Sequence, residues 1–142
     1  MVEVRAFSDG DRRQVVALWN LVFPGAPAHK DPDENINQKL RLQRELFFVA
    51  VDGDRVLGTA MGGYDGHRGW VYRVAVHPSH RRRGIGAALM QRVEEALVAL
   101  GCSKLNLQTG VGNEKALAFY ESLGFKAEPR VSMGKLLRVP SG

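Results

Sequence analysis

The segment from Val76 to Leu100 restricts the possible folds of this chain more than any other. It begins as the end of an apolar strand and continues through a basic turn, in which arginines occupy positions 81–83 directly before Gly84-Ile85-Gly86. Beyond the turn, apolar residues recur at three- and four-residue steps, at Ile85, Ala88, Leu89, Val93, Ala96, Leu97 and Leu100. This spacing predicts an amphipathic helix from about residue 84 to residue 100, which Gly101 ends. Such a helix needs a sheet or other helices to cover its apolar face.

The turn itself has the properties of a phosphate-binding loop. Glycine allows the backbone to approach a ligand closely, and the first N–H groups of a helix have no partner within the helix. Together with the positive end of the helix and the guanidinium groups, they favour an anion such as phosphate. Neither of two familiar phosphate loops fits, because Ala87 stands where a Walker A loop has lysine and Leu89 where a dinucleotide fingerprint has its third glycine. A solvated turn without a ligand is the alternative.

The order of the other patterns predicts an α/β sandwich, in which a mixed sheet is packed between helices. Asp52-Gly53 between two apolar runs is a strong hairpin signal. The strand at 70–76, the helix and the apolar residues 105–108 together predict a parallel pair of strands. Further strands are expected at 2–7, 46–51, 56–61, 125–127 and 131–137, and further helices at 11–23, after Asp31-Pro32 and at 114–124.

Length and composition predict a single domain over residues 1–142, with no metal site. The length suits one hydrophobic core. The single cysteine, Cys102, rules out an intrachain disulfide, and the four histidines show no metal-ligand spacing. No apolar run approaches the length of a membrane span and the first residues lack a signal-peptide layout, so a cytoplasmic location is expected.

The net charge of +5 would suit an anionic partner. Nucleic acid is one such partner, but the aromatic fraction is only 8% and no zinc-finger or RNA-binding motif occurs. Much of the positive charge is concentrated at residues 81–83, where a small polyphosphate would also explain it. We therefore expect a small phosphorylated ligand, and neither nucleic acid nor a membrane, as the partner.

A second segment follows the glycine turn after about thirty residues and reads Asn113-x-x-Ala116-x-x-Phe119-Tyr120-x-x-x-Gly124-Phe125. On its own it would predict a helix that Asn113 caps and whose aromatic face packs in a core. Coming after Arg81-x-x-Gly84-x-Gly86, which itself follows Val-His-Pro, it resembles the cofactor helix of the GNAT superfamily of N-acetyltransferases. The preceding hairpin and N-terminal helices are also similar, and the chain resembles most the small bacterial members called YpeA-like.

The resemblance implies a GNAT-like sandwich with a mixed, mostly antiparallel sheet. It also implies an enzyme that moves the acetyl group of acetyl-CoA directly to a primary amine of an unidentified acceptor. Strand backbone groups would bind the pantetheine, loop amides and arginines would bind the pyrophosphate, Asn113 would orient the pantetheine arm, and Tyr120 would donate a hydrogen bond or proton to the departing sulfur. The implied cofactor site comprises Val74, Ala75, Val76, Arg81, Arg82, Arg83, Gly84, Ile85, Gly86, Ala87, Asn113 and Tyr120.

The sequence does not identify the general base. Many family members have a glutamate on the strand before the loop, and none lies between Trp70 and Val76 here. His67, Asp65, Tyr72 and a water chain are the candidates. The alternative function is a CoA-binding sensor or interaction module that has kept the loop but has little catalytic activity.

Three further features concern the acceptor and partners. Acidic residues at Asp31, Asp33, Glu34 and Asp65 would favour a cationic acceptor. The polar helix after Asp31-Pro32 is either a lid over the substrate or a solvated connector. By analogy with other proteins of this type, residues 131–137 would pair with a second copy in a homodimer.

Overall fold

The computed structural model describes residues 1–25 and 27–137, and the chain divides into two units, Met1–Leu107 and Gln108–Gly142. The first unit contains, in order, β1 (Glu3–Ala6), α1 (Arg12–Val22), α2 (Pro32–Arg41), β2 (Phe47–Asp52), β3 (Arg55–Tyr64), β4 (Gly69–Val76), α3 (Ile85–Ala99) and β5 (Leu105–Asn106). The second contains α4 (Glu114–Ser122). Among the described residues, no helix combines the length and the apolar character needed to cross a membrane.

The sheet of the first unit has the order β1-β2-β3-β4-β5, and only the β4–β5 pair is parallel. The β2–β3 hairpin closes where Asp52 faces Arg55, with Gly53 in a left-handed conformation at φ 60°, as its Asp-Gly pair predicts. Helix α3 connects the two strands of the parallel pair along the chain, as the strand, helix, strand pattern predicts. The predicted mixed, mostly antiparallel sheet is confirmed.

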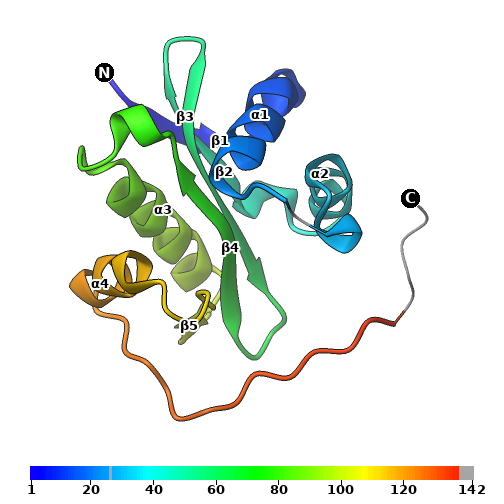
Figure 1. The fold of residues 1–142 in the computed structure, drawn as a ribbon, viewed down its shortest axis with the longest axis vertical. Helices are drawn as coiled ribbons and strands as arrows, with labels where there is room; N and C mark the ends of the chain where they lie inside the picture. Colours follow the sequence, from blue (N-terminus) through cyan, green and yellow to red (C-terminus); the bar gives the residue numbers. More distant parts are fainter. Residues whose placement is uncertain (26, 138–142) are drawn as a thin grey trace. The chain divides into compact units, whose positions relative to one another are not determined.

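Helices cover both faces of this sheet, with α1 and α2 on one face and α3 on the other (Figure 1). On the α1 side, Trp19 is fully buried and stacks on Phe47 at a centroid distance of 5.9 Å. The α3 side is closely packed at Gly58, where a Cβ would lie 2.9 Å from the Ala75 carbonyl oxygen and 3.0 Å from Leu89 Cδ1. Apolar residues of α3 at the predicted spacing fill that side, at Ile85, Leu89, Met90, Val93 and Leu97. This packing fixes α3 against β3 and β4.

Strand β4 carries a bulge in its middle. Thr59 faces Ala75 and Met61 faces Tyr72, so two β4 residues, Arg73 and Val74, lie opposite one residue of β3. Arg73 has φ 52°, the left-handed region that is unusual for a residue with a side chain. Beside the bulge, Tyr72 is 53% exposed, so this part of β4 is not covered on both faces, although the strand is almost entirely apolar.

The other edge of β4 is paired only at its start. Strand β5 pairs with β4 at Gly69 and Trp70, and no strand among the described residues pairs with Val71–Val76 on that side. The backbone N–H and C=O groups that point outward along this part of β4 are therefore free of a ladder partner.

In the second unit, α4 forms where the sequence predicts it, with Asn113 as its N-cap and Gly124 beyond its end at φ 96°. The prediction of strands at 125–127 and 131–137 is wrong, because the described residues 125–137 contain no strand. Pro129 and Gly134 interrupt the alternating pattern, and apolar side chains such as Val131 and Met133 are exposed. The homodimer expectation, which relied on a strand there, stays a prediction.

Candidate functional site

The turn before α3 is built from two left-handed residues, Arg82 at φ 64° and Gly84 at φ 78°. Gly84 is the N-cap of α3, and the first helical hydrogen bond runs from the Ala88 N–H to the Gly84 carbonyl oxygen at 3.0 Å. The N–H groups of residues 85–87 precede that bond and have no acceptor within the helix. They lie at the positive end of a 15-residue helix, which is the arrangement expected for binding an anion.

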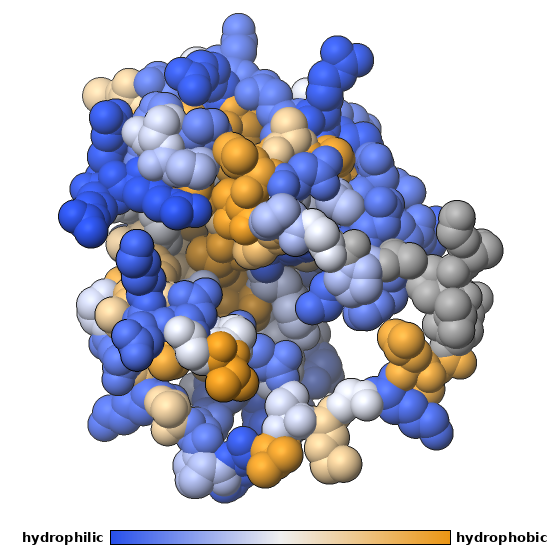
Figure 2. All heavy atoms as spheres, in the orientation of Figure 1, coloured by the Kyte–Doolittle hydropathy of each residue, from blue (hydrophilic) through white to orange (hydrophobic). Residues whose placement is uncertain are grey.

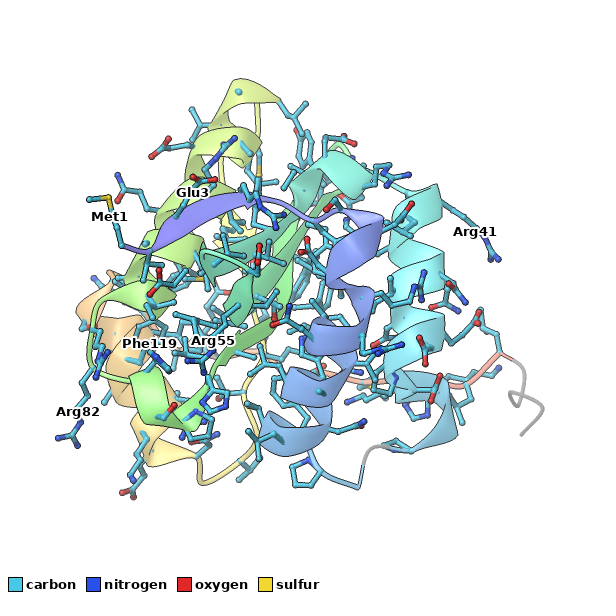
Figure 3. All side chains as sticks on the ribbon, turned by 90° about the horizontal axis from the view of Figure 1, so that it is seen from above. Met1, Glu3, Arg41, Arg55, Arg82 and Phe119 are labelled. Carbon is cyan, nitrogen blue, oxygen red and sulfur yellow. The ribbon has the colours of Figure 1, made fainter. Side chains whose placement is uncertain are left out.

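The three arginines of the turn are exposed and available to such an anion. Arg82 extends away from the body of the first unit (Figure 3), and hydrophilic side chains dominate this edge in Figure 2. Arg81 Nε donates weakly to the Val76 carbonyl oxygen at 3.4 Å, which keeps its side chain near the end of β4. None of the three forms an ion pair with a carboxylate of the described residues.

The predicted pantetheine residues continue directly from this turn. Ala75 is buried, while Val74 and Val76 are partly exposed on the part of β4 that has no outer partner strand. A 3₁₀ turn over Pro78–His80 connects them to the arginines. The first unit therefore brings together the residues predicted at 74–76 and 81–87, as one backbone edge that leads to the start of α3.

The second unit carries the remaining two predicted residues. The Asn113 side-chain oxygen accepts a hydrogen bond from the Ala116 N–H at 3.1 Å, so it caps α4. Tyr120 lies edge-on to Phe119 and Phe125, at centroid distances of 5.0 and 5.7 Å. Burial raises the pKa of Tyr120 from its usual value, so the phenol keeps its proton at neutral pH and can act as a hydrogen-bond donor.

Two of the candidate bases are poorly suited to accept a proton. Asp65 Oδ1 accepts the backbone N–H groups of Arg68 at 2.7 Å and His67 at 2.8 Å, and these bonds lower the pKa of its carboxyl group. Partial burial raises the pKa of Tyr72, with Asp65 adding to the effect, so this phenol stays protonated at neutral pH. The side chain of His67, the third candidate, is exposed.

The acidic residues expected to attract a cationic acceptor are largely engaged within the protein. Asp31 caps α2 by accepting the Glu34 N–H at 3.1 Å. Asp33 forms an ion pair with Arg12 at 3.3 Å, and Asp65 is held in its turn. Their carboxylates therefore have local structural partners.

Sequence reasoning missed a buried network behind the bulge. Trp19 Nε1 donates to Thr59 Oγ1 at 2.8 Å, and Thr59 Oγ1 donates to the Arg73 carbonyl oxygen at 2.8 Å. Thr59 is fully buried, so this chain of bonds fixes the bulge from inside the core. The only sequence signal was Arg73 itself, the one charged residue in an otherwise apolar strand.

The first unit also has a cavity of about 220 Å³ beside α1 and the start of β3. It is lined by Gln14, Ala17, Leu18, Leu21, Arg55, Val56 and His77, and so includes none of the residues predicted to bind the cofactor. The predicted cofactor site is an open strand edge followed by an exposed turn, which does not enclose a volume. The cavity and the predicted cofactor site are therefore different places on the first unit.

Comparison with known proteins supports the resemblance to the GNAT family. The model of the acetyltransferase (GNAT) family matches residues 12–125. An acetyltransferase of Yersinia pestis is 39% identical over 141 residues, a match that covers 97% of each chain. A Trypanosoma brucei acetyltransferase structure has a TM-score of 0.71 at 26% identity and covers 96% of this chain and 100% of its own.

A structure of the enzyme AAC(6′)-Iy in complex with a bisubstrate analogue, CoA-S-monomethyl-acetylneamine, has the higher TM-score of 0.79. At 19% identity, with 96% of this chain and 98% of that chain covered, it supports the fold alone. The predicted GNAT sandwich is thereby confirmed. By its family match and its relatives at 39% identity, the chain belongs to the GNAT family of acetyltransferases, which use acetyl-CoA.

Proposed function

We propose that this protein is an N-acetyltransferase that moves the acetyl group of acetyl-CoA directly to a primary amine. We further propose that it is of the small bacterial YpeA-like type, acts in the cytoplasm, and uses residues 1–142 as a single domain. The extent of the family match supports the single domain, because residues 12–125 include most of the first unit and α4 of the second.

The observation that carries the proposal is the continuous backbone edge from β4 to α3. An extended arm with amide groups needs both donors and acceptors, and the open edge at Val74–Val76 offers both. A pyrophosphate at the end of that arm needs clustered N–H donors and positive charge. Residues 85–87 and the arginines at 81–83 offer these immediately beyond the strand.

The proposed reaction gives each of the remaining groups a role. Acetyl-CoA supplies a thioester whose carbonyl carbon is attacked by the amine while its C–S bond breaks. Tyr120 donates a hydrogen bond or a proton to the departing sulfur, and its raised pKa favours the hydrogen bond. Asn113 orients the pantetheine arm through its amide group. His67 or a water chain takes the proton that the amine loses.

The binding half is tested by calorimetric titration of acetyl-CoA and CoA into wild type and Gly84→Trp. A Cβ at Gly84 meets no atom within 4 Å, so the indole would project into the space proposed for the phosphates. Gly101→Trp is the matched control, because Gly101 has a similar φ of 88°, is equally open, and lies just beyond the other end of α3. We expect Gly84→Trp to lose acetyl-CoA and CoA binding and Gly101→Trp to keep it. If wild type does not bind acetyl-CoA or CoA even at millimolar concentration, the proposal is rejected.

The catalytic half is tested by thiol release across a panel of amines with wild type and Tyr120→Phe. We expect the variant to bind acetyl-CoA as wild type does, with kcat about 100-fold lower. The absence of a carboxylate base on β4 is the observation that favours the sensor alternative. Binding by wild type without turnover on any amine would support that alternative.

A further inference from the structure

Arg73 is held differently from the surface arginines. Figure 3 shows Arg41 and Arg82 extending away from the protein body, as surface cations usually do. Arg73 is half-buried, and its guanidinium carbon lies 4.6 Å from the centroid of the Trp19 ring and 5.3 Å from that of the Phe23 ring. Burial lowers the pKa of Arg73. A cation withdrawn from water in this way needs compensating partners.

The compensation within the protein is incomplete. Arg73 Nε and Nη2 donate to Asn35 Oδ1 at 3.0 and 2.7 Å, and Nη2 also donates to the Lys30 carbonyl oxygen at 2.6 Å. Both acceptors are neutral. Among the described residues, no carboxylate forms an ion pair with Arg73, although Asp31 acts on it from farther away. Nη1 has no hydrogen bond to a described residue, so its two N–H groups can bind a ligand.

The backbone maintains this arrangement in a disfavoured conformation. The bulge gives Arg73 its positive φ of 52°, and the side chain is thereby directed toward α1 and α2. Thr59, which is itself held by Trp19, fixes the Arg73 carbonyl oxygen. Strain that is supported by a buried network is a frequent property of functional sites.

A second cation lies on the same side of the sheet. Lys39 follows Asn35 by one turn of α2, so both face β3 and β4. Lys39 Nζ donates to the carbonyl oxygen of Gly62, which pairs with Val71. Burial lowers the pKa of Lys39, and Glu45 acts on it only from a distance. The α2 side of the sheet thus holds two half-buried cations that form no ion pair with a described residue.

We propose that Arg73 binds a carboxylate of the acceptor, so that the acceptor is an amine that also carries an acidic group, as amino acids do. The inference rests on the proposed function, because Arg73 directly precedes Val74–Val76, where the pantetheine arm would lie. An amine that reaches the thioester from the α1 and α2 side would bring a neighbouring carboxylate to Arg73 Nη1. Lys39 adds positive potential on the same side of the sheet. This replaces the expectation of a cationic acceptor.

The test compares amines that differ only by a carboxylate. Thiol release from acetyl-CoA is measured with L-lysine and cadaverine, L-phenylalanine and 2-phenylethylamine, and L-histidine and histamine. We expect wild type to prefer the carboxylate-bearing member in at least one pair, by about 10- to 100-fold in kcat/KM. Equal turnover within every active pair, or a preference for the decarboxylated amine, would overturn the proposal.

Variants separate recognition from a structural role. Arg73→Gln should abolish the preference mainly through KM, while Arg73→Lys should keep part of it because the charge remains. Asn37→Ala is the matched control, because Asn37 lies on α2 together with Asn35, the residue that accepts from Arg73. The Asn37 side chain instead accepts a hydrogen bond from Arg12 at 3.0 Å and forms none with Arg73. Asn37→Ala should keep the wild-type preference. A preference that persists in Arg73→Gln would show that Arg73 is structural only.

If none of these amines is acetylated, a binding measurement tests whether Arg73 binds a carboxylate. N-acetylglycine, a carboxylate that resembles a product, is titrated into CoA-loaded wild type and Arg73→Gln while tryptophan fluorescence is followed. Saturable binding in wild type that the variant lacks would support the proposal, and no binding in wild type would overturn it. Failure of acetyl-CoA itself to bind would instead reject the proposed function, so the two failures are distinguishable.

Discussion

At the scale of single residues, two carboxylates near the N-terminus differ in their exposure to solvent and in their hydrogen bonds. Asp11 is buried and accepts both Nη1 and Nη2 of Arg5, at 2.8 and 2.9 Å, together with the Ser8 N–H at 2.9 Å. Asp9 and Arg44 form a longer pair of 3.9 Å at the surface. The first carboxylate is held by several charge-assisted bonds, and the second is mainly solvated.

We expect Asp11→Asn to lower the free energy of unfolding by about 1–3 kcal/mol at neutral pH. The hydrogen bonds from Arg5, aided by Ser8, lower the pKa of Asp11. A carboxyl group with a lowered folded-state pKa stabilises the fold above its unfolded value of about 3.9 and loses that effect as the pH falls through the folded value. Urea unfolding at several pH values would show this loss in wild type and a smaller one in the variant.

Asp9→Asn is the control, with an expected change of about 0–1 kcal/mol, because the exposed pair is screened by solvent. If the two variants lost equal stability, or if Asp11→Asn kept the wild-type pH dependence, the assignment of Asp11 would be wrong.

At the scale of elements, helix ends serve two purposes in this chain. The start of α3 has free N–H groups that suit an anion, whereas the start of α4 is closed by the Asn113 side chain. Asn113 has two chemically distinct ends: its carbonyl oxygen is used in the cap, and its NH₂ group is the part proposed to orient pantetheine.

Asn113→Asp and Asn113→Ala separate these two uses. Aspartate keeps a cap oxygen, so we expect little loss of stability, whereas alanine should cost about 1 kcal/mol. Because aspartate lacks the NH₂ donors, both variants should weaken CoA binding if the amide contacts the ligand. Thermal unfolding and calorimetry on the same samples measure both quantities. Wild-type affinity in Asn113→Asp would leave Asn113 as a cap only.

The sequence predicted some elements well because their signals are local. The helix expected over 84–100 is found at Ile85–Ala99, since its apolar period, the left-handed Gly84 and the terminal Gly101 all act within a few residues. The strands expected at 125–127 and 131–137 are absent from the described residues, because a strand also needs a partner that its own residues do not specify. The Arg73 bulge was unpredictable for the same reason, since it depends on the register between β3 and β4.

At the scale of the whole molecule, the proposed single domain predicts cooperative behaviour of both units. If the residues proposed at 74–87 and at 113 and 120 bind one ligand, that ligand should stabilise the two units together. Acetyl-CoA at about 100 times its Kd should add about 2.7 kcal/mol. For a chain of this length we expect the unfolding midpoint to rise by about 5–10 °C.

Differential scanning calorimetry with and without acetyl-CoA tests this expectation. One transition that shifts as a whole would support a single domain. Two transitions, of which only one responds to the ligand, would indicate that the units unfold independently.

The open edge of β4 has a consequence for how the protein behaves between reactions. Unpaired strand edges are templates on which other chains can add a strand, and this is a common origin of aggregation. Among the described residues, 71–76 offer such an edge, which is interrupted by the bulge and followed by the positive charges of the turn. If the pantetheine arm binds along this edge as proposed, the cosubstrate takes the place of an edge strand, and we expect the protein without it to aggregate more readily than the protein with it.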